Sequence, residues 1–188
     1  MRDAVLHMQV TFDGFASGPD GDLEWAFPQF DDEEFTRYSL DMLSGTDVEI
    51  MGGTTGEGLA GYWPKLDTMQ ERDKPFAALI NAAPKVIFSK SLESVDWNNT
   101  TIYRDDPYEE IRRLKQQPGK PIMVVGGVTF VQSLNNERLI DEYALIVHPV
   151  AIGRGLSLFS ELKDQLKLKL VEARAFPAGS TLMRYRLA

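Results

Sequence analysis

The feature that most restricts the fold is an apolar run that ends in two glycines just before a helical pattern. Four apolar residues, Ile122 to Val125, lead into Gly126 and Gly127, and apolar residues at helical spacing follow. Either the glycines serve a tight strand-to-helix turn, or they let a phosphate group approach the backbone closely. A second expected strand, TDVEIMGG, also ends in a glycine pair. The rest of the chain must decide between the two interpretations.

Strand-like and helix-like segments alternate along most of the chain, and two strand-like segments close it. The patterns predict strands over 3–12, 46–53, 85–92, 101–103, 121–125 and 141–152. They predict helices over 30–45, 70–84, 106–119 and 127–139, and one or two helical turns over 54–63. Residues 166–188 are expected to form a hairpin. This order predicts an α/β fold with a mostly parallel sheet, flanking helices and an antiparallel C-terminal hairpin. From the length, we expect residues 1–188 to form one domain.

Composition excludes several classes of function. The chain carries 20 basic and 28 acidic residues, a net charge of −8, which argues against nucleic acid or an anionic membrane as the main partner. It has no cysteine, so thiolate nucleophiles, disulfides and cysteine-ligated metals are excluded, and its two histidines disfavour a histidine-rich metal site. No signal peptide or membrane-length apolar run is visible, so we expect a cytoplasmic protein with a small-molecule substrate and no metal.

Three expected strands end in glycine or small hydroxyl residues, and ligands bind at the carboxyl ends of parallel strands. The three ends are residues 52–55, 89–91 and 126–129. Backbone N–H groups at a helix start suit a phosphate, although each junction alone is also typical of a packing turn. Lys90 is the candidate for an extra phosphate such as the one that separates NADPH from NADH; the alternative is a solvated turn lysine. No Rossmann or P-loop motif is present.

Acids crowd the start of the expected helix over 30–45. Asp31 or Asp32 could donate a proton or anchor a cationic heterocycle, but acids also suit a helix N-terminus in any protein. Trp25 could form the floor of a substrate pocket or simply be packed. His148 precedes Pro149 in a strand, and a structural role is favoured for it over a catalytic one.

Five motifs taken together resemble one family. They are VTFDGFASGPDGDLEW, IMGGTTGEGLAGYWP, VIFSKSL, VVGGVTFVQSL and LIVHPVAIGRGLSLF. In order and spacing they resemble the dihydrofolate-reductase-like superfamily, and most closely the stand-alone proteins related to the C-terminal reductase domain of bifunctional riboflavin-biosynthesis deaminase/reductases. The resemblance implies an eight-stranded sheet, NADPH as cofactor, a ribosylaminopyrimidine-like or pteridine-like substrate, and a possible homodimer.

The resemblance also implies roles for individual residues. The implied cofactor-binding residues are Ala16 in a covering loop, Gly52, Gly53, Thr54, Ser89, Lys90, Gly126, Gly127, Val128 and Thr129. Asp31 and Asp32 are the candidates for the acid that orients or protonates the substrate. Relatives usually have an arginine at the position of Gly53, so this chain departs from the pattern there. An NADPH-dependent reductase is the first hypothesis; a non-catalytic nucleotide- or ligand-binding protein on the same fold is the alternative, and an interaction module is third.

Overall fold

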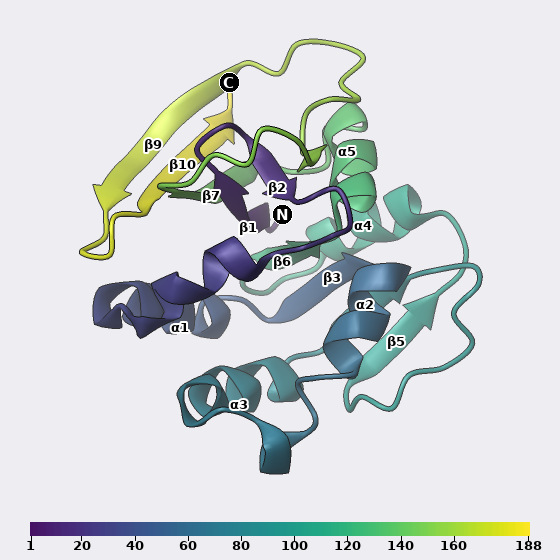
Figure 1. Ribbon diagram of the computed structural model, residues 1–188. Helices are drawn as coiled ribbons and strands as arrows, with labels where there is room; N and C mark the ends of the chain where they lie inside the picture. The colour runs from purple at the N-terminus through teal and green to yellow at the C-terminus, as the bar shows by residue number, and fades with distance from the viewer.

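An eight-stranded sheet forms the centre of the molecule. The computed structural model covers residues 1–188, and side chains are described for residues 1–28 and 31–188. The strand order is β5-β4-β3-β6-β1-β7-β10-β9, with the C-terminal hairpin at one edge and β5 at the other (Figure 1). The strands are β1 (Ala4–Thr11), β3 (Val48–Gly52), β4 (Lys85–Phe88), β5 (Thr100–Tyr103), β6 (Ile122–Gly126), β7 (Glu142–His148), β9 (Leu168–Ala175) and β10 (Thr181–Leu187).

The strand directions confirm the predicted fold class. Strands β5, β4, β3, β6, β1 and β7 pair in parallel, whereas β10 runs antiparallel to both β7 and β9. The sheet is therefore mostly parallel, and the C-terminal hairpin supplies its antiparallel edge. None of the described helices is both long and apolar enough to span a bilayer.

Helices cover both faces of the sheet. They are α1 (Glu33–Ser44), α2 (Gly53–Ala60), α3 (Lys74–Ala82), α4 (Pro107–Gln116) and α5 (Val128–Asn136). Successive side chains of a strand point to opposite faces, so β3 contributes to two cores. Its Ile50 packs in the core that contains Ile111 of α4 and Leu134 of α5, whereas Met51 packs with Phe76 of α3. The α1 helix packs on the same face as α3, where Phe35 joins the apolar cluster around β1 and β7.

A small second sheet was not predicted. Strand β2 (Phe15–Ser17) pairs with β8 (Leu156–Ser157), two segments that the sequence patterns indicate as loop. A Cβ added at Gly155 would lie 2.1 Å from the backbone oxygen of Ser17, so this contact requires glycine. The pairing ties the loop after β1 to the segment after β7.

Several element boundaries differ from the predicted ones for local reasons. The helix predicted over 30–45 begins at Glu33, because Asp32 is its N-cap and the residues before it form a 3-10 helix, η1 (Glu24–Asp31). The helix predicted over 70–84 begins at Lys74, preceded by the 3-10 turns η2 (Leu66–Thr68) and η3 (Glu71–Asp73). Strand β7 stops at His148 because Pro149 has no N–H for the ladder.

Candidate functional site

The main cavity opens at the carboxyl ends of β3 and β6. Its volume is about 760 Å³, and its described walls come from β1, β3 and β6, from α1, α2, α3 and α5, and from the loop that contains β2. Of the predicted cofactor-binding residues, those that line it are Ala16, Gly52, Thr54, Gly126, Gly127, Val128 and Thr129. A cavity of this size at strand ends is typical of a small-molecule or cofactor site.

Two helix N-termini meet at the glycine end of the cavity. The N-caps of α2 and α5 are Gly52 and Gly127, and neither has a side chain that could satisfy the first N–H groups. The Gly126–Gly127 peptide bond is cis, and Gly126 has a φ of +133°, which L side chains rarely adopt. A Cβ added at Gly127 would lie 2.7 Å from Oγ1 of Thr55 in α2. The glycines therefore bring two sets of free N–H groups close together, and such groups attract anions.

The third predicted strand end lies beside this pair but outside the cavity lining. Ser89 follows β4, and a Cβ added at Gly53 would lie 2.7 Å from its Oγ and 2.8 Å from its Cβ. A larger residue at position 53 would therefore require the turn after β4 to move. The Ser89 hydroxyl accepts a 3.0 Å hydrogen bond from the N–H of Leu92. Lys90 is exposed at the same turn.

The two predicted catalytic acids lie apart from the described cavity lining. Asp31 ends η1, and its carboxylate forms a 2.7 Å ion pair with Arg72 on the surface. The Asp32 carboxylate accepts hydrogen bonds from the N–H groups of Glu34 (2.9 Å), Phe35 (3.1 Å) and Ala178 (2.7 Å). Asp32 thus caps α1 and ties it to the turn of the C-terminal hairpin. A role for either acid in catalysis stays a prediction.

Trp25 is packed rather than open to the cavity. Its ring lies edge-on against His148, with centroids 5.1 Å apart, and it is not among the described lining residues. The Nε2 atom of His148 lies 2.6 Å from Oε1 of Gln9, and burial lowers the pKa of His148 to about 4. These contacts fit the packing alternative for Trp25 and a structural role for His148.

Sequence reasoning missed the polar residues on the sheet face of the cavity. His7 and Gln9 of β1, Ser39 of α1 and Glu49 of β3 all line it. Burial lowers the pKa of His7 to about 4 and raises the pKa of Glu49 to about 7, the latter partly offset by the Lys85 ammonium. The signal for Glu49 was present, because an acid stands between Val48 and Ile50 in an otherwise apolar strand.

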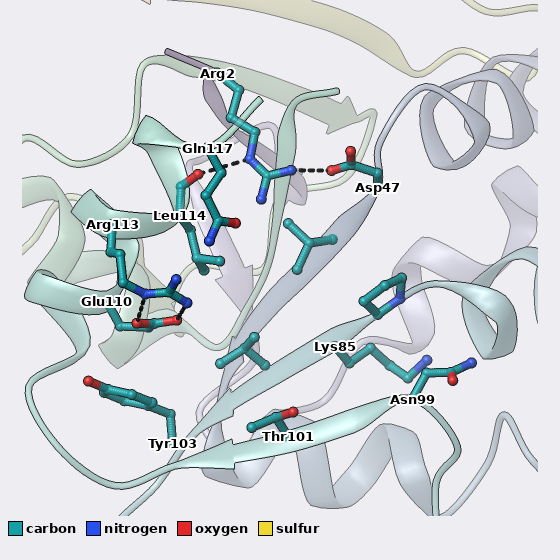
Figure 2. Close-up of a pocket in the computed structure, with 13 residues that line it drawn as sticks. Arg2, Asp47, Lys85, Asn99, Thr101, Tyr103, Glu110, Arg113, Leu114 and Gln117 are labelled. Atoms are coloured by element: carbon teal, nitrogen blue, oxygen red, sulfur yellow. Dashed lines mark hydrogen bonds and ion pairs between the residues drawn. The ribbon is translucent and has the colours of Figure 1, made fainter. Parts of the chain in front are cut away.

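A second hollow of about 400 Å³ lies near the amino-terminal ends of β3 and β4, beside α4 (Figure 2). Its charged side chains bind one another or the backbone. Arg113 forms a bidentate ion pair with Glu110, at 2.6 and 2.5 Å, and Arg2 pairs with Asp47. The Lys85 ammonium donates hydrogen bonds to backbone carbonyls at the end of α3. Among the described residues, no group of three or more acids and histidines could hold a metal ion.

Comparison with known proteins places the chain in a family. Residues 3–182 match the family described as the RibD C-terminal domain. The uncharacterized protein YyaP of Bacillus subtilis (strain 168) is 32% identical over 184 residues, which cover 98% of this chain and 94% of that one. These two matches agree in spanning nearly the whole chain.

Two solved structures share the fold. A putative riboflavin biosynthesis protein from Shewanella sp. PV-4 superposes with a TM-score of 0.76 at 19% identity, covering 99% of both chains. Dihydrofolate reductase from Enterococcus faecalis, complexed with NADP(H), superposes with a TM-score of 0.63 at 12% identity, covering 98% of this chain and 96% of that one. The resemblance seen in the five sequence motifs is confirmed: the fold is dihydrofolate-reductase-like, and the chain belongs to the RibD C-terminal domain family of reductase-type proteins.

Proposed function

We propose that this protein is an NADPH-dependent reductase that transfers hydride to a small heterocycle. The observation that carries the proposal is the pair of glycine-capped helix N-termini at the rim of the cavity. The α2 and α5 N–H groups converge there without side-chain caps, and the dipoles of both helices favour negative charge at that point. A dinucleotide pyrophosphate has the charge and the acceptor oxygens that such a site requires.

The residues present fit this cofactor. Gly127, Val128 and Thr129 would hold the pyrophosphate through backbone N–H groups, and the α2 N-terminus around Thr54 would hold the facing oxygens. Ser89 and Lys90 remain the candidates for the adenosine ribose and its phosphate. When bound, the nicotinamide supplies the hydride; the protein supplies position and exclusion of water. The covering loop with Ala16 lines the cavity and would exclude solvent from the reacting end.

A second candidate function is ligand binding without hydride transfer. Asp31 and Asp32 are the proton donors predicted from the sequence, and neither belongs to the described cavity lining. Their position favours this alternative, because hydride transfer to the substrate needs a proton donor near it. The two functions differ in turnover. Oxidation of NADPH in the presence of a ribosylaminopyrimidine or pteridine would support the reductase, whereas dinucleotide binding without turnover on either class would support the alternative.

The first test is a titration with NADPH and, separately, NADH. Trp63 lines the cavity, so tryptophan fluorescence should report binding, and calorimetry provides an independent readout. Gly127→Val should weaken NADPH binding by about 100-fold, because its side chain would occupy space against Thr55 and block the approach of a phosphate. Lys90→Ala should reduce the preference for NADPH over NADH.

The matched control is Gly61→Ala, which adds a methyl group at the other end of α2. Gly61 has a φ of −72°, and the added Cβ would lie 3.2 Å from the Gly58 oxygen, a contact that a small shift relieves. This variant should bind NADPH as the wild type does. If the wild-type protein binds neither dinucleotide, the glycines serve only the strand-to-helix turn and the reductase proposal is wrong.

A further inference from the structure

The cavity has a second, buried end on the sheet face under α1 and α3. In the sheet register, Glu49 of β3 lies opposite Met123 of β6, and Met123 lies opposite Val5 of β1. His7 follows two residues later on the same face of β1. Neighbouring strands are roughly 4.8 Å apart and two residues add roughly 6.6 Å along β1, so the Cα atoms of Glu49 and His7 are roughly 12 Å apart. Met123, on the strand between them, gives this end of the cavity an apolar floor.

Glu49 is a buried acid that the fold itself does not use. Its side chain lines the cavity, and the residue is 3% exposed. Among the described residues, no hydrogen bond or ion pair reaches its carboxyl group. Its cross-strand neighbour Lys85 turns its ammonium to the carbonyls of Ile80 (2.7 Å) and Ala83 (2.6 Å) instead. Desolvation raises the pKa of Glu49 to about 7, so near neutral pH the carboxyl group can either donate or accept a hydrogen bond.

Two further polar atoms at this end of the cavity also lack partners. The Nε2 atom of His7 and the Oγ atom of Ser39 are buried and form no hydrogen bond with any described residue. Burial keeps His7 neutral at pH 7, so its ring offers one donor and one acceptor at most. Buried polar groups in folded proteins are almost always paired, and groups that line a cavity without a partner are available to a ligand.

The charge of the lining indicates which ligand suits these groups. Glu49 is the described lining residue that can carry a full charge at neutral pH, and none of the described lining residues is lysine or arginine. A phosphate at the buried end would face the Glu49 carboxyl group, with no lysine or arginine among the described lining residues to bind it. A ring that presents N–H groups would instead satisfy the carboxyl oxygens and rest on Met123.

We propose that Glu49, supported by His7 and Ser39, selects a small heterocycle that donates N–H hydrogen bonds and carries no phosphoribosyl group. This inference rests on the proposed reductase function, because it names the substrate class of the same cavity. Between the two substrate classes that the sequence left open, it favours the pteridine-like ring over the phosphorylated ribosylaminopyrimidine. Glu49 is then a residue that determines specificity, and the acids near α1 are not needed for recognition.

The test compares two probes by calorimetry on the full chain, with and without saturating NADPH. The first probe is 2,4-diaminopyrimidine, which offers amino donors, and the second is uridine 5′-phosphate, a pyrimidine with a phosphoribosyl group. The wild-type protein should bind 2,4-diaminopyrimidine at least tenfold more tightly than uridine 5′-phosphate. Glu49→Gln should weaken 2,4-diaminopyrimidine binding at least tenfold and leave NADPH binding unchanged. The control, Glu161→Gln at an exposed position, should change neither affinity.

Three binding results would contradict the proposed role of Glu49. Equal or tighter binding of uridine 5′-phosphate, no binding of 2,4-diaminopyrimidine, or full affinity in Glu49→Gln would overturn the inference. If Glu49→Gln does not fold, the probe preference of the wild type and the loss of affinity in Ser39→Ala decide instead. Binding of 2,4-diaminopyrimidine that depends on Glu49 in a protein that binds no dinucleotide would refute the reductase function while the inference on recognition stands.

Discussion

The two hollows of this molecule differ in what their polar groups do. In the hollow beside α4, Arg113 binds Glu110 and Arg2 binds Asp47 (Figure 2). The Lys85 ammonium there binds backbone carbonyls. In the main cavity, by contrast, the Nε2 atom of His7 and the Oγ atom of Ser39 have no partner among the described residues, and the carboxyl group of Glu49 has neither a hydrogen bond nor an ion pair with them.

The difference separates groups that hold the fold together from groups that await a ligand. Burying a polar group without a partner costs free energy, so several such groups lining one cavity indicate a site where a ligand can satisfy them. Glu49 and Lys85 show both cases on adjacent strands, since they are cross-strand neighbours and only Lys85 is bonded. The comparison implies that substitutions in the hollow beside α4 should cost stability, whereas substitutions in the cavity should cost binding and can even increase stability.

The largest expected effect is the loss of the Lys85 ammonium. Lys85 is 1% exposed, and its Nζ donates to the carbonyls of Ile80, Asn81 and Ala83. Lys85→Met would leave these carbonyls without a donor, and we expect it to lower the free energy of unfolding by about 3 kcal/mol. Urea denaturation at pH 7 measures this change. Lys167→Met, at an exposed lysine, should change the free energy of unfolding by less than about 0.5 kcal/mol.

A stable Lys85→Met variant would break the comparison, because it would mean that the hollow beside α4, like the cavity, holds a charge the fold does not need. In that case the burial of Lys85 would itself require a functional explanation. A loss of stability with unchanged NADPH binding would sharpen the comparison instead.

The next effect has the opposite sign and depends on pH. The pKa of Glu49 is about 7 in the folded protein, whereas an unburied glutamate has a pKa of 4.5. Folding therefore disfavours the ionised form. The contribution of Glu49 to the free energy of unfolding is highest at low pH, where its carboxyl group is protonated, and it falls as the pH rises from about 4.5 through 7. A pKa shift of this size lowers the free energy of unfolding by about 3 kcal/mol at most. Glu49→Gln removes the charge but keeps a buried polar amide, so at pH 8 its free energy of unfolding should exceed that of the wild type by about 1–2 kcal/mol.

The same variant should match the wild type in stability at pH 4, where Glu49 is protonated in both states. Lys85, the cross-strand neighbour of Glu49, and His7 and Tyr38, whose rings lie against each other, are titratable groups near this face that the variant retains. The pKa of His7 is lowered to about 4, so its contribution to stability is lost as the pH falls from 6.5, equally in both proteins. Unfolding curves at pH 4, 6 and 8 test this. A variant that is less stable than the wild type at pH 8 would show that ionised Glu49 contributes to the fold.

The sequence predicted the fold class correctly, but it did not predict the polar residues at the buried end of the cavity. Apolar alternation and glycine position predicted the strand ends, and the structure brings Gly52 and Gly127 together as expected. The pairing of β2 with β8 was not predictable, since both strands are two or three residues long and their pairing depends on a close approach at Gly155. Short strands carry too little periodicity to be detected.

The polar residues of the cavity were missed because they lie on strands whose pattern indicated only burial. His7 and Glu49 point to the same face of the sheet from β1 and β3, a relation that depends on strand order and register rather than on sequence distance. The acids near α1 drew attention because they are clustered in the sequence. Clustering at a helix start has its own cause, which the structure shows for Asp32.

The smallest expected changes in stability are those of substitutions at Asp32, the N-cap of α1, and at its neighbour Asp31. Asp32→Ala removes a carboxylate that accepts from the N–H groups of Glu34, Phe35 and Ala178, so we expect a loss of about 1–2 kcal/mol. Asp32→Asn keeps an acceptor oxygen and should lose less. Asp31→Asn breaks only an exposed ion pair with Arg72 and should change the free energy of unfolding by less than about 0.5 kcal/mol. Denaturant titration measures all three variants.

Binding measurements on the same variants decide whether Asp31 or Asp32 also serves the reaction. If Asp32 acts only as a cap, Asp32→Asn will bind NADPH and 2,4-diaminopyrimidine with wild-type affinity while Glu49→Gln loses the second ligand alone. A tenfold or greater loss of 2,4-diaminopyrimidine affinity in Asp32→Asn or Asp31→Asn, with α1 intact by circular dichroism, would place the recognition acid at the start of α1. The contrast between bonded and unbonded polar groups would then fail as a guide to this site, because a carboxylate bonded within the fold would be the one that binds the substrate.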